Sequence, residues 1–194
     1  MFVHRDPPPV EKVLQNREDL KKWRQDGADL LVVRPVAGGV AESSPRTRVA
    51  LVCRLLNEAQ VRYALVGGAA VVLHGVVRAT KDIDILIEAT PENAARALDA
   101  LSNLTFGVAR ELDAEAVARA HVTVVGDVPS VDIFTLAWNV RYADVVPTLL
   151  RVQVDGVEVP LVDIETLIRS KQTDRLLDRA DIEALQRLKQ LRSR

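Results

Sequence analysis

The sequence has few of the features that mark secreted or membrane proteins. A single cysteine, Cys53, occurs among 194 residues, so no internal disulfide can form, and its apolar, helix-like surroundings predict a buried and inert thiol. No hydrophobic run approaches the roughly 20 residues that span a bilayer, and the N-terminus has no apolar signal core. We therefore expect a cytoplasmic protein with no membrane partner.

The chain also lacks an excess of either charge. Its 26 Lys and Arg against 27 Asp and Glu leave a net charge of -1, which provides no general field for nucleic acid. Any RNA or DNA partner would have to be held by a local patch of positively charged residues. The chain does have 48% hydrophobic and 27% charged residues, the balance of a soluble globular protein, and its length predicts one domain with an appendage.

The most informative stretch begins with an apolar run at residues 64–66 that ends abruptly in Gly67 and Gly68. Residues 69–74 then read as a helix. A strand, a glycine turn and a helix in this order bring backbone N–H groups to a helix N-terminus, where the partial positive charge favours phosphate. Because the two glycines have no Cβ, a ligand can approach the main chain closely.

Two aspartates follow on a second apolar stretch, residues 81–87. The strand period of two places Asp82 and Asp84 on one face. Adjacent like charges repel, so a divalent cation such as Mg²⁺, which prefers hard oxygen ligands, is the economical explanation. The alternative is an exposed edge strand with two solvated aspartates, which the preceding glycines make less favourable.

These residues resemble the signature of the DNA polymerase β-type nucleotidyltransferase superfamily. That signature is a hydrophobic residue, Gly and Gly or Ser, about ten residues, and Asp-x-Asp or Asp-x-Glu; Val66-Gly67-Gly68 and Asp82-Ile83-Asp84 fit it. The surrounding residues 73–75 and 78–82 are most similar to the small bacterial branch that contains minimal nucleotidyltransferases and AbiEii-like toxins. The resemblance covers about residues 47–190.

The resemblance implies a third carboxylate and a metal centre. Val131-Asp132-Ile133 has the hydrophobic-Asp-hydrophobic form of the strand that brings this acid beside the first two, although a lone strand aspartate is usually just solvated. Asp82, Asp84 and Asp132 would then hold two Mg²⁺ ions, and Asp132 would accept the proton of the attacking hydroxyl. Gly67 and Gly68 would hold the β and γ phosphates of an NTP.

Two cations are candidate nucleotide-binding residues. Arg78 directly precedes the acidic strand and is placed to neutralise phosphate charge, with a surface arginine as the alternative. Lys171 matches a helix that carries a lysine toward the nucleotide in the resembled family, with a solvated helical lysine as the alternative. Asp181, near the start of the final helix, is expected to cap that helix or to pair, for example with Arg175.

The element pattern predicts an α+β fold, with a mixed, mostly antiparallel sheet, flanking helices and a helical C-terminus. Residues 1–45 are expected to form an N-terminal extension and linker, and residues 46–194 the nucleotidyltransferase domain. Helices are expected at 10–25, 47–58, 69–74, 91–101, 114–119, 164–171 and 179–191, and strands at 30–33, 64–66, 81–87, 106–109, 121–125, 130–134, 151–154 and 157–161.

The leading hypothesis is a Mg²⁺-dependent nucleotidyltransferase of the toxin-antitoxin type. It would move an NMP from an NTP to an acceptor hydroxyl on tRNA or protein, and a cognate antitoxin would be its partner. One alternative is modification of a small molecule such as an aminoglycoside, for which Glu111, Asp113 and Glu115 offer weak acidic support. Another is a catalytically silent nucleotide-binding or partner-binding module, because Ala69 stands where many relatives carry a hydroxyl residue.

Overall fold

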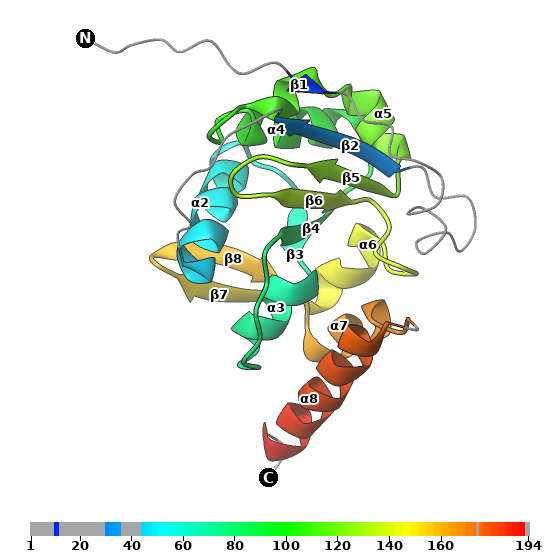
Figure 1. Ribbon diagram of the computed structural model, residues 1–194. Helices are drawn as coiled ribbons and strands as arrows, with labels where there is room; N and C mark the ends of the chain where they lie inside the picture. The colour runs from blue at the N-terminus through cyan, green and yellow to red at the C-terminus, as the bar shows by residue number, and fades with distance from the viewer. Residues whose placement is uncertain (1–9, 12–29, 36–43, 174, 193–194) are drawn as a thin grey trace.

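The strands form one mixed sheet in the order β1-β2-β5-β6-β4-β3-β8-β7 (Figure 1). The computed structural model describes residues 10–11, 30–35, 44–173 and 175–192. Four pairings are antiparallel (β1–β2, β3–β4, β5–β6 and β7–β8) and three are parallel (β2–β5, β3–β8 and β4–β6). The strands are β1 (Val10–Glu11), β2 (Leu30–Pro35), β3 (Tyr63–Leu65), β4 (Ile83–Ile87), β5 (Val122–Val125), β6 (Val131–Phe134), β7 (Leu150–Val154) and β8 (Val157–Leu161).

Helices flank this sheet, and the expected α+β class is confirmed. Side chains cap several N-termini as their types predict; the Asp163 carboxylate, for example, accepts a hydrogen bond of 2.9 Å from Thr166 N. No helix in the described ranges is long and apolar enough to cross a membrane. The helices are α2 (Pro45–Glu58), α3 (Gly67–Leu73), α4 (Pro91–Leu101), α5 (Ala114–Arg119), α6 (Tyr142–Val145), α7 (Ile164–Ser170) and α8 (Leu176–Arg192), with 3₁₀ turns η1 (Val108–Glu111) and η2 (Val146–Thr148).

The strand expected at residues 106–109 does not form. The chain turns at Gly107, whose φ is +64°, and continues into η1. The buried carboxylate of Asp127 accepts hydrogen bonds from Phe106 N at 2.8 Å and Val108 N at 3.0 Å. These two backbone donors therefore serve a side chain rather than a neighbouring strand, which explains why the prediction was wrong.

The N-terminal segment contributes to the sheet edge. The strand expected at 30–33 is confirmed as β2, which runs parallel to β5. Val10–Glu11 forms β1, antiparallel to β2, so the expected helix at 10–25 is wrong at its start. The rest of that expected helix lies outside the described residues.

The core is densest around β4. Ile83, Ile85, Leu86 and Ile87 are each at most 2% exposed, so both faces of this strand are covered. The thiol of Cys53, on α2, lies in the same core, and burial raises its pKa to about 11. The expectation of a buried and inert cysteine is thereby confirmed.

A buried amide fixes the ends of β3 and β4 relative to α4. Asn93 Oδ1 accepts from Arg62 N at 2.8 Å, and its Nδ2 donates to Arg62 O at 2.9 Å and to Glu88 O at 3.1 Å. Arg62 precedes β3 and Glu88 follows β4, so one fully buried side chain satisfies three backbone groups at the sheet's centre.

We expect Asn93→Ala to lower the free energy of unfolding by about 3 kcal/mol, because it removes three hydrogen bonds and leaves Arg62 N without its acceptor. Urea unfolding followed by circular dichroism measures the change. Asn103→Ala is the matched control, since Asn103 is exposed and bonds only to carbonyls at the end of α4; it should cost less than about 1 kcal/mol. Equal losses in the two variants would contradict the role given to Asn93.

Candidate active site

The glycine turn is built around the carboxylate of Asp84. Gly67 has φ +62°, a left-handed conformation that side chains disfavour, and a Cβ there would overlap the carboxyl group of Asp84 and lie 2.6 Å from its Cβ. Gly68 N donates to Asp84 Oδ2 at 3.1 Å, and Val66 N donates to Asp84 O at 3.0 Å. The start of α3 therefore packs directly against β4.

A hydroxyl and a guanidinium lie over the second glycine. A Cβ on Gly68 would be 2.8 Å from Thr80 Oγ1 and 3.1 Å from Arg78 Nη2. Thr80 Oγ1 itself donates to Asp82 O at 3.1 Å. The sequence pattern did not single out Thr80; its position two residues before the first aspartate was the only available signal.

The register of the sheet brings Asp84 and Asp132 together. β4 and β6 are parallel, and Asp84 is the direct partner of Asp132. Neighbouring strands lie about 4.8 Å apart, and residues in register point to the same face. Asp82 is exposed and lies at a bend just before β4, where the period of the strand no longer applies; its negative charge is close enough to raise the pKa of Asp84.

Asp84 carries negative charge that its protein surroundings only partly compensate. Its pKa is raised to about 6, mainly by burial and further by repulsion from Asp82, while the Gly68 N–H and the charges of Lys171 and Arg78 oppose the shift. Within the described ranges, no three His, Cys, Asp or Glu side chains are already gathered as a metal site. Carboxylates at Asp84 and Asp132 on adjacent strands nevertheless form the hard-oxygen donor set that suits Mg²⁺.

Both candidate nucleotide-binding cations are largely buried. The side chain of Lys171 is 4% exposed, and its Nζ lies 2.8 Å from Asp181 and 3.2 Å from Asp178. Arg78, with its side chain 16% exposed, also forms an ion pair with Asp181. The alternatives of a solvated lysine and a surface arginine are therefore wrong.

The expectation that Asp181 pairs is confirmed, but its partners are Arg78 and Lys171. Arg175 instead lies 3.9 Å from Asp178. The spacing of Asp178 and Asp181, three residues apart on α8, places both on one helix face and was the signal for this cluster. Sequence reasoning missed the convergence because the partners come from three separate elements.

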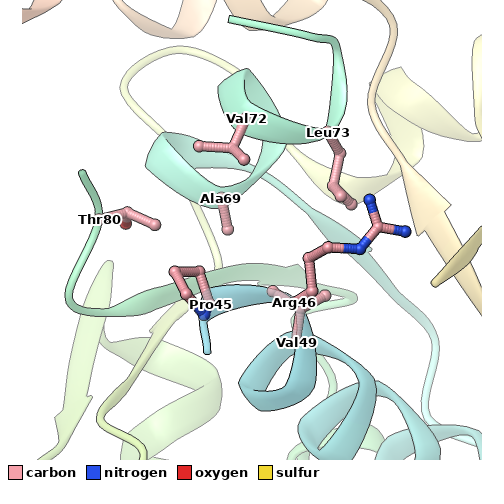
Figure 2. A pocket seen from close by; sticks show the side chains of 7 residues that line it. All are labelled: Pro45, Arg46, Val49, Ala69, Val72, Leu73 and Thr80. Carbon is pink, nitrogen blue, oxygen red and sulfur yellow. The ribbon is translucent and has the colours of Figure 1, made fainter. Parts of the chain in front are cut away.

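A small apolar pocket adjoins the glycine turn between the start of α2 and α3 (Figure 2). Ala69 and Thr80 both line it. The Thr80 hydroxyl lies 2.8 Å from the position that a Cβ on Gly68 would take, so it is the hydroxyl group that the structure places at the turn's second glycine. The remaining lining residues are Pro45, Arg46, Val49, Val72 and Leu73.

His74, at the end of α3, has a structural role. Its Nε2 lies 2.8 Å from Val162 O, and burial lowers the pKa of its imidazole. A neutral ring in contact with a backbone carbonyl ties α3 to the end of β8.

No family model matches the chain, and no curated protein matches it. Among solved structures, the chain is similar to an antigenic nucleotidyltransferase-like protein from Paracoccidioides brasiliensis, with a TM-score of 0.51 and 19% sequence identity. The match covers 76% of this chain and 78% of that chain. The likeness is one of fold, and it confirms the nucleotidyltransferase-like architecture expected from the sequence.

We expect Gly67→Ala to destabilise the protein by at least about 2 kcal/mol, because a Cβ there meets both an unfavourable φ and the Asp84 carboxyl group. Gly156→Ala is the matched control. Gly156 has a similar φ of +78°, but nothing lies within 4 Å of its Cβ position. Thermal unfolding measures both variants, and an equal loss at the two positions would contradict the close approach of Asp84.

The raised pKa of Asp84 predicts that its ionised form destabilises the folded protein. Between the unfolded value near 3.8 and the folded value near 6, the folded state binds more protons, so this contribution weakens the fold as pH rises. In magnesium-free buffer, the stability of the wild type relative to Asp84→Asn should fall by about 1 kcal/mol from pH 5 to pH 7.5. Urea unfolding at both pH values measures it; a pH-independent difference would contradict the assignment.

Proposed function

We propose that this chain is a Mg²⁺-dependent nucleotidyltransferase that moves an NMP from an NTP to an acceptor hydroxyl. The observation that carries the proposal is the parallel register that pairs Asp84 with Asp132, with the glycine turn seated on the Asp84 carboxylate. The nucleotidyltransferase-like fold supports this arrangement as a site of phosphoryl chemistry.

In this reaction the acceptor oxygen attacks the α-phosphorus, the bond from that phosphorus to the β-phosphate oxygen breaks, and pyrophosphate leaves. Asp132 accepts the proton of the attacking hydroxyl, a task that needs only hydrogen-bond reach in the loaded complex. Asp82, Asp84 and Asp132 are the residues that would hold magnesium, which supplies charge stabilisation for the attacking and leaving oxygens.

Arg78 and Lys171 provide positive charge for binding the triphosphate of the NTP. The Gly68 N–H already donates to Asp84, so less of the turn's hydrogen-bonding capacity remains for phosphate. Arg78 Nη2 extends over Gly68, and its planar fork suits phosphate oxygens. The cations therefore carry more of the triphosphate binding than the turn alone.

The sequence resemblance to the toxin-like bacterial branch supplies the candidate acceptor classes. We propose tRNA or a protein side chain as acceptor, and a cognate antitoxin as partner. Two of the three acidic residues that offered support for an aminoglycoside acceptor have other roles: Asp113 caps α5 by accepting from Ala116 N at 2.8 Å, and Glu115 pairs with Arg119 at 3.1 Å. These contacts give the small-molecule alternative no further support.

We expect Asp82→Asn and Asp132→Asn each to lower nucleotidyl transfer by at least about a thousandfold, because each removes a charged oxygen ligand. Purified protein is incubated with each labelled NTP, Mg²⁺ and bulk tRNA, cell lysate or an aminoglycoside. Asp155→Asn, in the turn between β7 and β8, is the matched control and should keep full activity. Turnover retained by either site variant would defeat the assignment.

The position of the label identifies the acceptor. Label on RNA or on protein supports the toxin-type activity, and label on the aminoglycoside favours the small-molecule alternative. Nucleotide binding without transfer to any of these acceptors would favour a catalytically silent module.

A further inference from the structure

A buried cluster of four charges joins α7, α8 and the segment between α3 and β4. It consists of Arg78, Lys171, Asp178 and Asp181; the last three side chains are each 4% exposed. A single atom, Asp181 Oδ2, contacts both cations: it forms an ion pair with Lys171 Nζ at 2.8 Å and accepts a hydrogen bond from Arg78 Nη1. Thr173 Oγ1 donates to Asp178 Oδ2 at 2.6 Å, which holds the second carboxylate in place.

We propose that Asp181 is a positioning residue: it holds the Arg78 guanidinium over Gly68, where that cation faces the NTP triphosphate, and it holds the Lys171 ammonium on the same carboxylate oxygen, where its charge supports Arg78 from behind. This inference rests on the proposed function and deepens it. Asp181 does not touch the substrate; it acts through the two cations.

The geometry of Arg78 supports this role. Its Nη1 is bound to Asp181, while its Nη2 lies 3.1 Å from the position that a Cβ on Gly68 would take. One planar guanidinium therefore spans the distance between α8 and the glycine turn. Because the fork is rigid, fixing one nitrogen on Asp181 also fixes the direction of the other.

The burial of Lys171 supports it as well. A buried ammonium needs a compensating charge, and a flexible four-carbon side chain loses conformational freedom when it is held in one place. Asp181 and Asp178 supply both the charge and the fixed acceptors. The proposal is that this cost is met before the nucleotide arrives, so that binding does not have to order the two cations.

The direction in which triphosphate affinity changes when Asp181 loses its charge distinguishes a positioning role from a purely electrostatic one. Coulomb attraction alone predicts that removing the negative charge of Asp181 tightens the binding of a triphosphate to the nearby cations. Positioning predicts the opposite, because Arg78 and Lys171 lose the acceptor that orients them. Tighter binding would also be the result if the aspartates competed with phosphate for these cations.

The experiment measures the affinity of the full-length protein for a non-hydrolysable NTP analogue with Mg²⁺, together with KM and kcat for transfer. We expect Asp181→Asn to weaken analogue binding and raise KM by about tenfold, and Asp181→Glu to recover part of the loss. Glu165→Gln is the matched control: it removes the exposed Glu165–Lys189 ion pair, which also joins α7 to α8, and should leave the affinity unchanged.

Unchanged or tighter binding by Asp181→Asn would overturn the positioning role while leaving the proposed function in place. An equal loss in Glu165→Gln would also overturn it, because the effect would then be general loosening of α8. If Asp181→Asn does not fold, the affinity of Asp181→Glu for the NTP analogue is the test. We expect it to be weaker than that of the wild type, and unchanged or tighter binding would overturn the positioning role. A wild-type protein that binds no NTP would overturn both the inference and the nucleotide site on which it rests.

Discussion

The contact between the Asp84 carboxylate and the glycine turn is the constraint on which the rest of the site depends. It requires a residue without a Cβ at position 67 and a left-handed φ at that residue. The hydrogen bond from Gly68 N to Asp84 then fixes α3 on the face of β4 that carries the acidic side chain. The face on which Asp132 lies follows from the pairing of β4 with β6, so the turn, the helix and both carboxylates share one side of the sheet.

Charge balance is the second organising feature. Asp84 is half-buried near the repelling charge of Asp82, and desolvation together with this repulsion raises the pKa of its carboxyl group. Arg78 and Lys171 oppose this shift, but they are themselves paired with the aspartates of α8. The acids are thus left with a need for positive charge, which we propose that a divalent cation meets, while the cations remain fixed close to the turn where we propose that the triphosphate binds.

Local patterns in the sequence predicted much of this arrangement. The strand, glycine turn, helix and acidic strand each have a short-range signal, and the structure has all four of them in the expected places. The period of a strand predicts that Asp82 and Asp84 share one face, whereas the structure begins β4 at Ile83 and leaves Asp82 at a bend before it. Resemblance to a known superfamily was needed to single out Asp132, since a lone aspartate on a strand has no local signature.

Contacts between segments that lie far apart in the sequence could not be predicted from local patterns. β4 and β6 are separated by two helices and another strand, so no local pattern specifies that Asp84 stands beside Asp132. The burial of Lys171 depends on acceptors from α8 in the same way. The expected strand at 106–109 failed for a related reason, because a distant carboxylate, Asp127, takes the backbone donors that a strand would have used.

The most direct test of the central claim is the position of a divalent cation. Crystals of the protein grown with Mn²⁺ and a non-hydrolysable NTP analogue would show it by anomalous scattering. We expect Mn²⁺ to be coordinated by carboxylate oxygens of Asp84 and Asp132, with Asp82 completing the site and the triphosphate reaching Arg78. A bound nucleotide with its metal held elsewhere, and with these carboxylates taking no part, would contradict it.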